Sequence, residues 1–229
     1  MPTGKTIRFL LASTLVLAMV PALSLGQSKP SQAPSKGPKG TIVIQVRARA
    51  GGFLPQALRD RIRGVPNVGQ VQSFLEGRTT DAVRVIGVEP APMLHLRSGN
   101  EALAAATVQG RGLEAGDAAE AMVVGKTFAQ KNKTALGLSI PTMLTKDHFP
   151  PIVVGGQGFA IIGIFATGDP ETDDQVLVLL PTAQQLLNQP GRVSGLYVLP
   201  AASGEQVSTD LRRALGTTAE VTVLPRRGP

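Results

Sequence analysis

Cysteine and tryptophan are missing from this 229-residue chain, and aromatic residues make up only 3% of it. The lack of cysteine excludes disulfides and thiolate metal sites but leaves the redox compartment open. With 42% hydrophobic residues the chain can build a core, which must consist mainly of Val, Ile, Leu and Ala. The scarcity of aromatic rings argues against binding of single-stranded nucleic acid, whose bases stack on aromatic side chains.

Acidic residues are absent from positions 1–40, which carry five basic residues. Most of the net charge of +7 therefore comes from this segment, because residues 41–229 hold 18 basic and 16 acidic residues. A nucleic-acid-binding protein concentrates its positive charge on its folded part. The charge distribution therefore predicts that nucleic acid is not a partner.

Signatures of catalysis are also absent from the sequence. There is no G-x-S-x-G nucleophile elbow. Gly125-Lys126-Thr127 looks like the end of a phosphate-binding loop, but Glu120 stands where that loop needs its first glycine. For Gly4-Lys5-Thr6 the corresponding position does not exist. We therefore predict no catalytic and no cofactor-binding residues, and a protein that is not an enzyme.

Candidate metal ligands are few. His95 and His148 are far apart in sequence, and neither belongs to an H-x-x-x-H arrangement, so we expect no metal site at either. The strongest local charge is an acidic cluster, Asp169, Glu171, Asp173 and Asp174. It offers oxygen ligands for calcium but lacks the spacing and the glycine of an EF-hand. We interpret it as a solvated loop between two strands.

Residues 1–26 form a predicted signal peptide or membrane anchor. Two basic residues precede an apolar stretch, residues 9–28, which small residues follow near its end, with cleavage expected after Ser24 or Gly26. Uncleaved, this stretch barely reaches the roughly 20 residues that a membrane helix needs. Both interpretations stay open, and both place the rest of the chain outside the cytoplasm. Residues 27–40, rich in Ser, Pro and Lys, predict a solvated linker.

Two β-α-β units are predicted, one at each end of the folded part. The first unit, residues 41–76, consists of a strand, an amphipathic helix and a strand, at 41–48, 54–64 and 68–76. The second unit, residues 193–224, repeats this pattern at 193–199, 203–215 and 219–224. Ser203 and Gln206 are expected to form a capping box on its helix. We expect the units to join in one split layer, as in ferredoxin-like folds; two unrelated units are the alternative.

Residues 77–192 predict an inserted β-rich lobe. Its expected strands are 82–88, 122–125, 158–165 and 175–180, all β-branched or continuously apolar. A short helix is expected at 182–188, with Thr182 and Gln185 as its capping pair, and residues 100–118 are expected to form a loop. The predicted fold class is α+β, a split β-α-β/β-α-β layer with an inserted β-rich lobe.

Residues 155–199 resemble a known family. The similar elements are Ile162-Gly163-Ile164, the acidic loop 169–174, the strand end 178–181, Thr182-Ala183-Gln184 and the strand 193–198. In this order they look like the closing portion of the periplasmic domain of MacB-like permeases, in the superfamily of the FtsX-like permeases. Upstream, residues 86–90 and 120–125 are similar to the G-V-D-P and E-A-V-V-G motifs of that family. The resemblance covers roughly residues 41–225.

The resemblance implies a domain inserted between two membrane helices of a permease, with a membrane-embedded permease half, a cytoplasmic ABC ATPase and a periplasmic protein as partners. Such a domain is expected to transmit ATP-driven motion to a periplasmic substrate or partner. The sequence departs from the family in showing no further membrane helices after the domain, so a free-standing exported binding or adaptor module is the alternative. Gly87, Gly163 and Pro181 are expected at turns and bulges rather than in a site.

Overall fold

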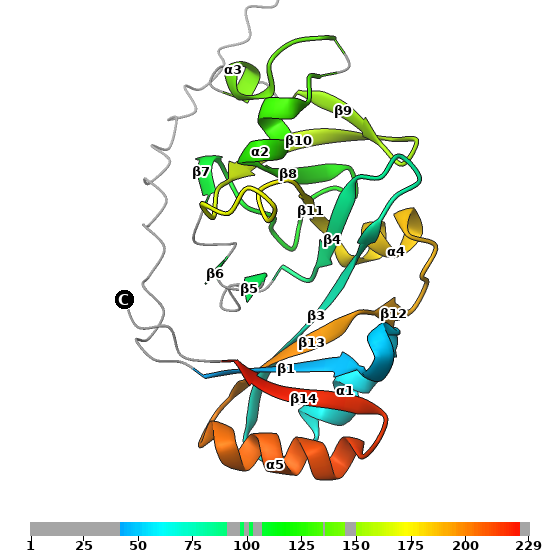
Figure 1. Cartoon of the computed structure of the whole chain (residues 1–229), viewed down its shortest axis with the longest axis vertical. Helices are drawn as coiled ribbons and strands as arrows, with labels where there is room; N and C mark the ends of the chain where they lie inside the picture. The colour runs from blue at the N-terminus through cyan, green and yellow to red at the C-terminus, as the bar shows by residue number, and fades with distance from the viewer. Residues whose placement is uncertain are drawn as a thin grey trace, which may run out of the picture. The chain divides into compact units, whose positions relative to one another are not determined.

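A ten-stranded mixed sheet organises the computed structural model, which describes residues 42–90, 97–98, 101–102, 107–134, 136–144 and 150–224 (Figure 1). In sheet order its strands are β14 (Ala219–Leu224), β1 (Val43–Ala48), β13 (Gly195–Pro200), β3 (Val68–Arg78), β4 (Arg84–Val88), β11 (Val176–Leu179), β8 (Ala121–Gly125), β10 (Gln157–Phe165) and β7 (Thr107–Gly110), with β9 (Pro151–Val154) also paired to β10. Two short pairs complete the strands: β2 (Leu54–Pro55) with β12 (Arg192–Val193), and β5 (Arg97–Ser98) with β6 (Glu101–Ala102). The helices are η1 (Arg49–Gly51), α1 (Leu58–Arg63), α2 (Lys126–Lys131), α3 (Ile140–Leu144), α4 (Leu180–Leu186) and α5 (Gly204–Leu215).

We call the lower part of Figure 1 the terminal layer: β14, β1, β13, the first half of β3, α1 and α5. All neighbouring strands in it are antiparallel. Ile44 and Val46 alternate with half-buried residues and point into a core that they share with Val207 and Leu211 of α5. Gly216 ends α5 in a backbone conformation with φ of 56°, which glycine adopts at little cost.

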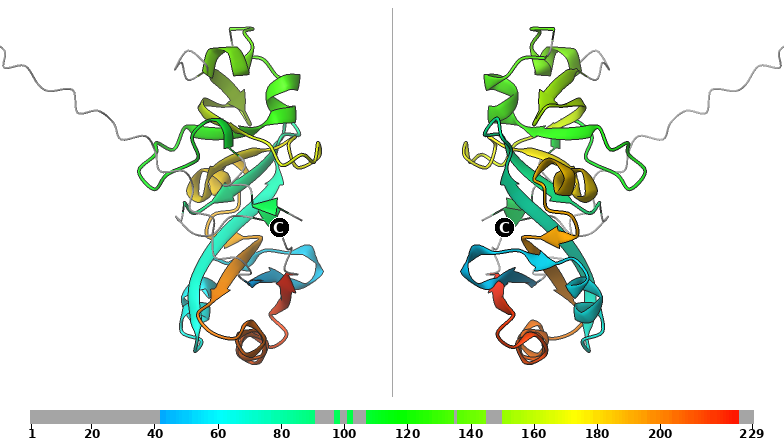
Figure 2. Two further views of the ribbon diagram at one scale, coloured as in Figure 1. Left: turned by 90° about the vertical axis from the view of Figure 1, so that its left-hand side faces the viewer. Right: turned by 90° about the vertical axis from the view of Figure 1, so that its right-hand side faces the viewer.

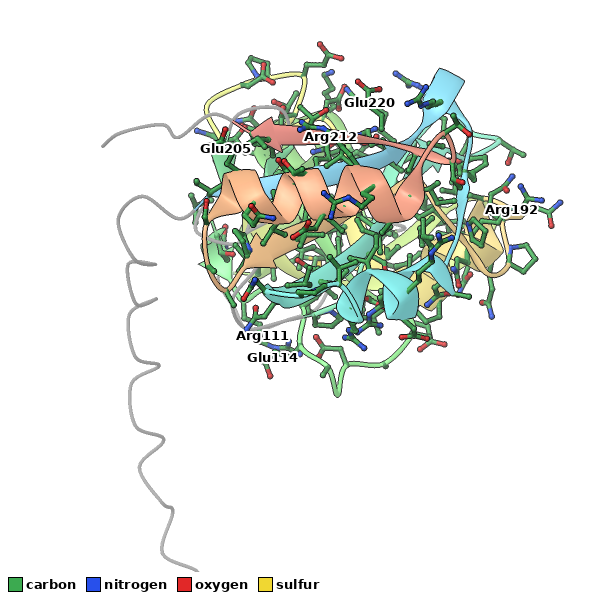
Figure 3. All side chains as sticks on the ribbon, turned by 90° about the horizontal axis from the view of Figure 1, so that it is seen from below. Arg111, Glu114, Arg192, Glu205, Arg212 and Glu220 are labelled. Atoms are coloured by element: carbon green, nitrogen blue, oxygen red, sulfur yellow. The ribbon has the colours of Figure 1, made fainter. Side chains whose placement is uncertain are left out.

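Figure 3 views the terminal layer from below and shows α5 running alongside β14. Arg212, labelled there, extends from α5 toward β14, where its Nη2 donates a hydrogen bond of 3.2 Å to the carbonyl oxygen of Val221. The guanidinium thus ties helix to strand at the surface. The apolar stem of such a side chain also covers core atoms beneath it.

The lobe consists of the second half of β3, β4, β7 to β11 and α2 to α4. Its strand directions are mixed, because β11 runs parallel to β4 but antiparallel to β8, and β10 runs parallel to β8. All five residues of β8 are buried, as expected for a strand that is covered on both faces. The two side views in Figure 2 show β3 running from the terminal layer into the lobe.

The predicted α+β class is confirmed, since the structure has a large mixed sheet with few helices. The ferredoxin-like description of the terminal units and the predicted domain boundaries stay predictions. The expected leader (residues 1–26), the linker (residues 27–40), His95 and His148 lie outside the described residues. Within the part that the structure describes, no helix is long and apolar enough to cross a membrane.

The predicted start of the first helix is wrong. Periodicity placed Leu54 in the helix, but α1 begins at Leu58. Leu54 is instead buried in β2, directly opposite Val193 of β12. A pairing with a strand more than 130 residues away overrides the local apolar period, which is a weak determinant by itself.

Both predicted helix caps are also wrong. Ser203 stands at the N-cap of α5, but its side chain makes no capping hydrogen bond, and Gln206 donates to Asp210 instead. Thr182 lies inside α4, which begins two residues earlier with Pro181 in its first turn. The hydroxyl of Thr182 donates to the carbonyl of Ala119 at 3.0 Å, so it anchors α4 to the chain before β8.

The region predicted as one loop, residues 100–118, contains β6 and β7. Neither α3 nor β9 was predicted. Short edge strands such as β7 and β9, four residues each, carry too little periodicity to be recognised. They pair with β10 because it offers an open edge, which is a property of the assembled sheet rather than of their own residues.

Gly87 generates a stability prediction. A β-carbon at this position would lie 2.2 Å from Cβ of Ala183, because α4 packs directly on β4 there. Gly87→Ala should therefore lower the free energy of unfolding by about 1–3 kcal/mol through overpacking. Gly158→Ala is the matched control, since a β-carbon there meets nothing within 4 Å. Equal midpoints of urea unfolding for the two variants would contradict the expectation.

Candidate functional site

Phe74 is the residue at which β3 changes partner. Earlier residues of β3 pair with β13, later ones pair with β4, and Phe74 pairs with both, opposite Gly195 on one side and Val88 on the other. The terminal layer and the lobe therefore belong to one sheet through this point of β3. We call the residues gathered around it the joint: Arg47, Arg59, Phe74, Glu76 and Glu89.

The ring of Phe74 is packed from several directions. It stacks on Tyr197 with ring centroids 4.6 Å apart and an interplanar angle of 24°, and the guanidinium of Arg47 lies 5.0 Å from its centroid. Gly195 provides the room, because a β-carbon there would lie 2.8 Å from Phe74 Cζ. Burial raises the pKa of Tyr197 above its ordinary value of 10.0.

Two arginine–glutamate pairs hold the joint, one on each face of the sheet. Arg47 of β1 contacts Glu76, which shares its face of β3 with Phe74, at 2.5 Å. Arg59 of α1 contacts Glu89, just beyond β4, at 2.6 Å on the face that α1 covers. Each pair joins an element of the terminal layer to a residue of the lobe, so together they oppose bending in either direction.

Glu89 also replaces a backbone partner where β4 leaves β3. The ladder between the two strands ends at Phe74 and Val88. The next amide of β3, from Ser73, donates to Glu89 Oε2 at 3.0 Å, and Gln72 Nε2 donates to the backbone carbonyl of Glu89. The side chain of Glu89 thus satisfies an amide that divergence of the strands would leave unpaired.

Unpaired polar atoms concentrate at the same place. Ser73 Oγ, Gln72 Oε1 and Arg59 Nε are three of the four buried side-chain atoms without a hydrogen-bond partner in the described part of the chain. Each such atom costs about 1–3 kcal/mol of desolvation. The sheet is therefore continuous at the joint, but the polar groups beside it are not all paired within the described part of the chain.

A polar cleft of about 250 Å³ lies in the lobe, at the far end of β3. It is lined by Arg78, Asp81, Ala82, Val83, Arg84, Phe128, Asn132, Glu171 and Asp174. Ion pairs flank it, Arg84 with Glu171 at 3.0 Å and Lys131 with Asp174 at 2.6 Å. The structure therefore brings two members of the predicted acidic cluster to the wall of one cleft.

The acidic cluster is not uniformly solvated. Asp173 lies in the predicted loop, but it is only 4% exposed and accepts hydrogen bonds from the amide and hydroxyl of Thr167, at 2.7 and 2.8 Å. The expected solvation is therefore wrong for this residue. Asp169 accepts from Thr172 instead of facing a ligand. Among the described residues, no group of three or more His, Cys, Asp or Glu side chains is placed to hold a metal ion.

The glycines singled out from the sequence have defined places. The register between β10 and β8 shifts between Ile161 and Gly163, which agrees with the predicted bulge. Gly87 lies within β4 rather than at a turn. Gly125, in the GKT triplet, precedes α2 and packs against Asp173, whose carbonyl oxygen would lie 2.1 Å from an added β-carbon. Protein backbone therefore fills the space that a phosphate loop would need open.

The residues of the joint were missed from the sequence alone. Arg47, Arg59 and Glu76 lie on three different elements, and Glu89 follows a fourth. A single charged residue in a surface pattern does not indicate which residue it will pair with. The available signal was Glu89-Pro90, which closes a motif of the resembling family. That motif indicated a turn, and only the fold shows that its carboxylate meets Arg59.

Comparison with known proteins gives one matching family and similar solved structures. The sequence model described as the MacB-like periplasmic core domain matches residues 12–214. The periplasmic region of MacB from Actinobacillus actinomycetemcomitans has a TM-score of 0.55 at 10% identity, covering 81% of this chain and 90% of that one. The extracellular domain of the noncanonic ABC-type transporter YknZ from Gram-positive bacteria gives 0.52 at 17%, covering 80% and 100%. At these identities the two structures show a shared fold alone. The comparison with curated proteins returned no match.

A double-mutant cycle tests the joint. Arg59→Ala, Glu89→Gln and the double variant should give a coupling free energy of about 1–2 kcal/mol in urea unfolding, because this pair is largely shielded from water. Arg63 and Asp60, 3.9 Å apart and 48% and 82% exposed, form the control pair, for which we expect less than about 0.5 kcal/mol. Similar coupling in the two cycles would show that the joint is an ordinary surface pair.

Asp81 generates a pH prediction. Burial opposes its ionisation, but hydrogen bonds from the Thr79 hydroxyl, the Gly155 amide and its own amide outweigh burial and hold its pKa below the ordinary value of 3.8. A lowered pKa stabilises the fold above pH 3.8, and this contribution disappears as the pH falls through the folded-state value. The stability gap between wild type and Asp81→Asn should therefore be present at pH 7 and shrink below pH 3.8. Urea titrations at both pH values measure it, with Asp60→Asn as the surface control; a gap that widens in acid would refute the assignment.

Proposed function

Because the chain belongs to the MacB-like periplasmic core domain family, the periplasmic domains of MacB-like ABC transporter permeases, we propose that it carries ATP-driven motion from the membrane to a periplasmic substrate or partner. The proposed partners are a membrane-embedded permease half, a cytoplasmic ABC ATPase and a periplasmic protein. Residues 9–28 would hold the chain in the membrane where they are not cleaved.

The pairing of the first and last strands of the domain carries this proposal. β1 and β14 are adjacent and antiparallel, with Val43 directly opposite Leu224. The first residue of β1 and the last residue of β14 therefore lie side by side, about 5 Å apart. A domain attached at two neighbouring points of one layer follows the movement of whatever holds those points.

The joint supports transmission from that layer into the lobe. Motion applied to β1 passes to β13 and β3 through antiparallel ladders, and β3 continues past Phe74 into the lobe. The pairs Arg47–Glu76 and Arg59–Glu89 limit bending on the two faces of the sheet. The unpaired buried atoms beside them favour a joint that changes arrangement under load.

A free-standing exported binding module is the second candidate function, and the polar cleft of about 250 Å³ favours it. The two candidate functions differ in which proteins should copurify with the chain. A transport-associated domain copurifies with ABC components, whereas a free module does not need them.

Affinity purification followed by hydrogen exchange tests the proposed function. The full chain, tagged and expressed in its source organism, should recover a permease and an ATPase from membranes solubilised in mild detergent. In that complex, ATP with vanadate should change amide exchange in β3 and β4 relative to ADP, because the joint rearranges with the transport cycle.

Matched variants sharpen the result. Arg59→Ala should keep both partners but reduce the nucleotide-dependent exchange difference in the lobe at least twofold, whereas Arg63→Ala should leave it unchanged. Recovery of the chain alone from the soluble periplasm would reject transmission and leave the binding module. Equal exchange with both nucleotides in an intact complex would reject the joint as the path.

A further inference from the structure

The cleft in the lobe has two walls from distant parts of the chain. One wall is the end of β3 and the turn that leads into β4, and the other is α2 with the loop between β10 and β11. The hydrogen bond of 3.0 Å from the Phe128 amide to the Asp173 carbonyl joins the two parts of the second wall. The volume of about 250 Å³ leaves room for several water molecules or for a small organic ligand.

Most charges around the cleft are already neutralised within the protein. The carboxylates of Glu171 and Asp174 are paired with Arg84 and Lys131. These pairs leave little free charge on that wall. They also fix the loop between β10 and β11 against β4 and α2, so the opening has a defined width before any ligand enters.

Two charges in the cleft have no charged partner among the described residues. Arg78 makes one hydrogen bond, from Nη1 to the carbonyl of Ala82 at 3.1 Å, and no ion pair. Asp81 accepts from the Thr79 hydroxyl and, at 3.0 Å, from the Gly155 amide, both neutral donors. The guanidinium and the carboxylate both keep capacity for a further hydrogen bond, since each carboxylate oxygen has two lone pairs.

The position of Asp81 is held from both sides. Its two oxygens bridge the turn after β3 and the turn between β9 and β10. Asn132 adds a neutral acceptor on the facing wall, because its amide nitrogen donates to the Phe128 carbonyl at 2.9 Å and leaves its amide oxygen available. Phe128 and Val83 supply apolar lining. The cleft thus combines one cation, one anion and a small apolar surface.

We propose that this cleft binds a small zwitterion, with the anionic group of the ligand at Arg78 and its ammonium group at Asp81. This chemistry has two sources, a free α-amino acid and the phosphoethanolamine headgroup of a lipid. A carboxylate or a phosphate fits a guanidinium fork, and an ammonium fits a carboxylate as a compact point charge. Arg78 lies four residues after Phe74 on β3. Ligand binding to the cleft can be measured on the isolated chain, so its test does not depend on a transport partner.

Calorimetric titration of the purified full chain in detergent tests the proposal with two probes, L-serine and O-phosphoethanolamine. Binding of either one is expected, and the tighter probe identifies the source. Arg78→Gln and Asp81→Asn should each weaken that probe at least about tenfold, because each removes one charge-assisted contact. Arg213→Gln, a 77% exposed arginine on α5, is the control and should bind like wild type.

Modified ligands separate the two ends of the site. Serine methyl ester lacks the carboxylate, so Arg78→Gln should not weaken it further, whereas N-acetylserine should be insensitive to Asp81→Asn. Thermal unfolding of each variant shows whether it is folded. Failure of both probes to bind wild type at millimolar concentration overturns the proposal, as does binding that neither folded variant weakens.

Discussion

The sheet stays continuous because β3 exchanges one partner strand for another at a single residue, Phe74. Such an exchange leaves backbone groups of β3 without a ladder partner on both edges of the strand. Here side chains and one neighbouring amide form hydrogen bonds with these groups. The Ser194 amide donates to the Phe74 carbonyl at 2.9 Å, and the Ser194 hydroxyl accepts from the Glu76 amide at 2.9 Å. Glu89 serves the Ser73 amide on the other edge. Without these substitutes, backbone groups on both sides of the exchange would lack a partner.

The ion pairs around this exchange are suited to restraint rather than to strong stabilisation. Arg47 and Glu76 are each about 40% exposed, so solvent screens much of their attraction. Pairs of this kind contribute roughly 1 kcal/mol or less, similar to the 1–3 kcal/mol by which effectors commonly bias conformational equilibria. If the domain transmits motion as proposed, pairs of this strength would hold one arrangement of the joint at rest and break under a modest load.

Much of the fold was predictable from local patterns. Alternation identified β1 and β14, a four-residue apolar repeat identified α5, and Gly216 marked its end, because burial of one face leaves its period in the sequence. The errors occurred where a distant segment decides the local structure. Leu54 became a strand residue through Val193, and Thr182 became an anchor for Ala119.

The candidate site was less predictable than the fold, for the same reason. Arg78 and Asp81 are ordinary surface residues in the sequence, and the facing α2 comes more than 40 residues later. Glu89 is recognisable only as part of a turn motif. Ion pairs between different elements produce no periodic pattern in the sequence. The sequence therefore shows which charged residues are present but not which of them come into contact.

The opposition of Val43 and Leu224 has a consequence for how such a domain spreads among genes. A domain whose two ends lie side by side can be inserted into a short loop of another protein with almost no change in the spacing of the flanking segments. The strand pair already holds the two ends together, so the insertion adds little loop-closure entropy. Removal of the domain is equally simple, because the two ends of the interrupted loop then lie close enough to be rejoined directly. The domain therefore has the geometry of a cassette, which membrane proteins of different topology can gain or lose as one piece.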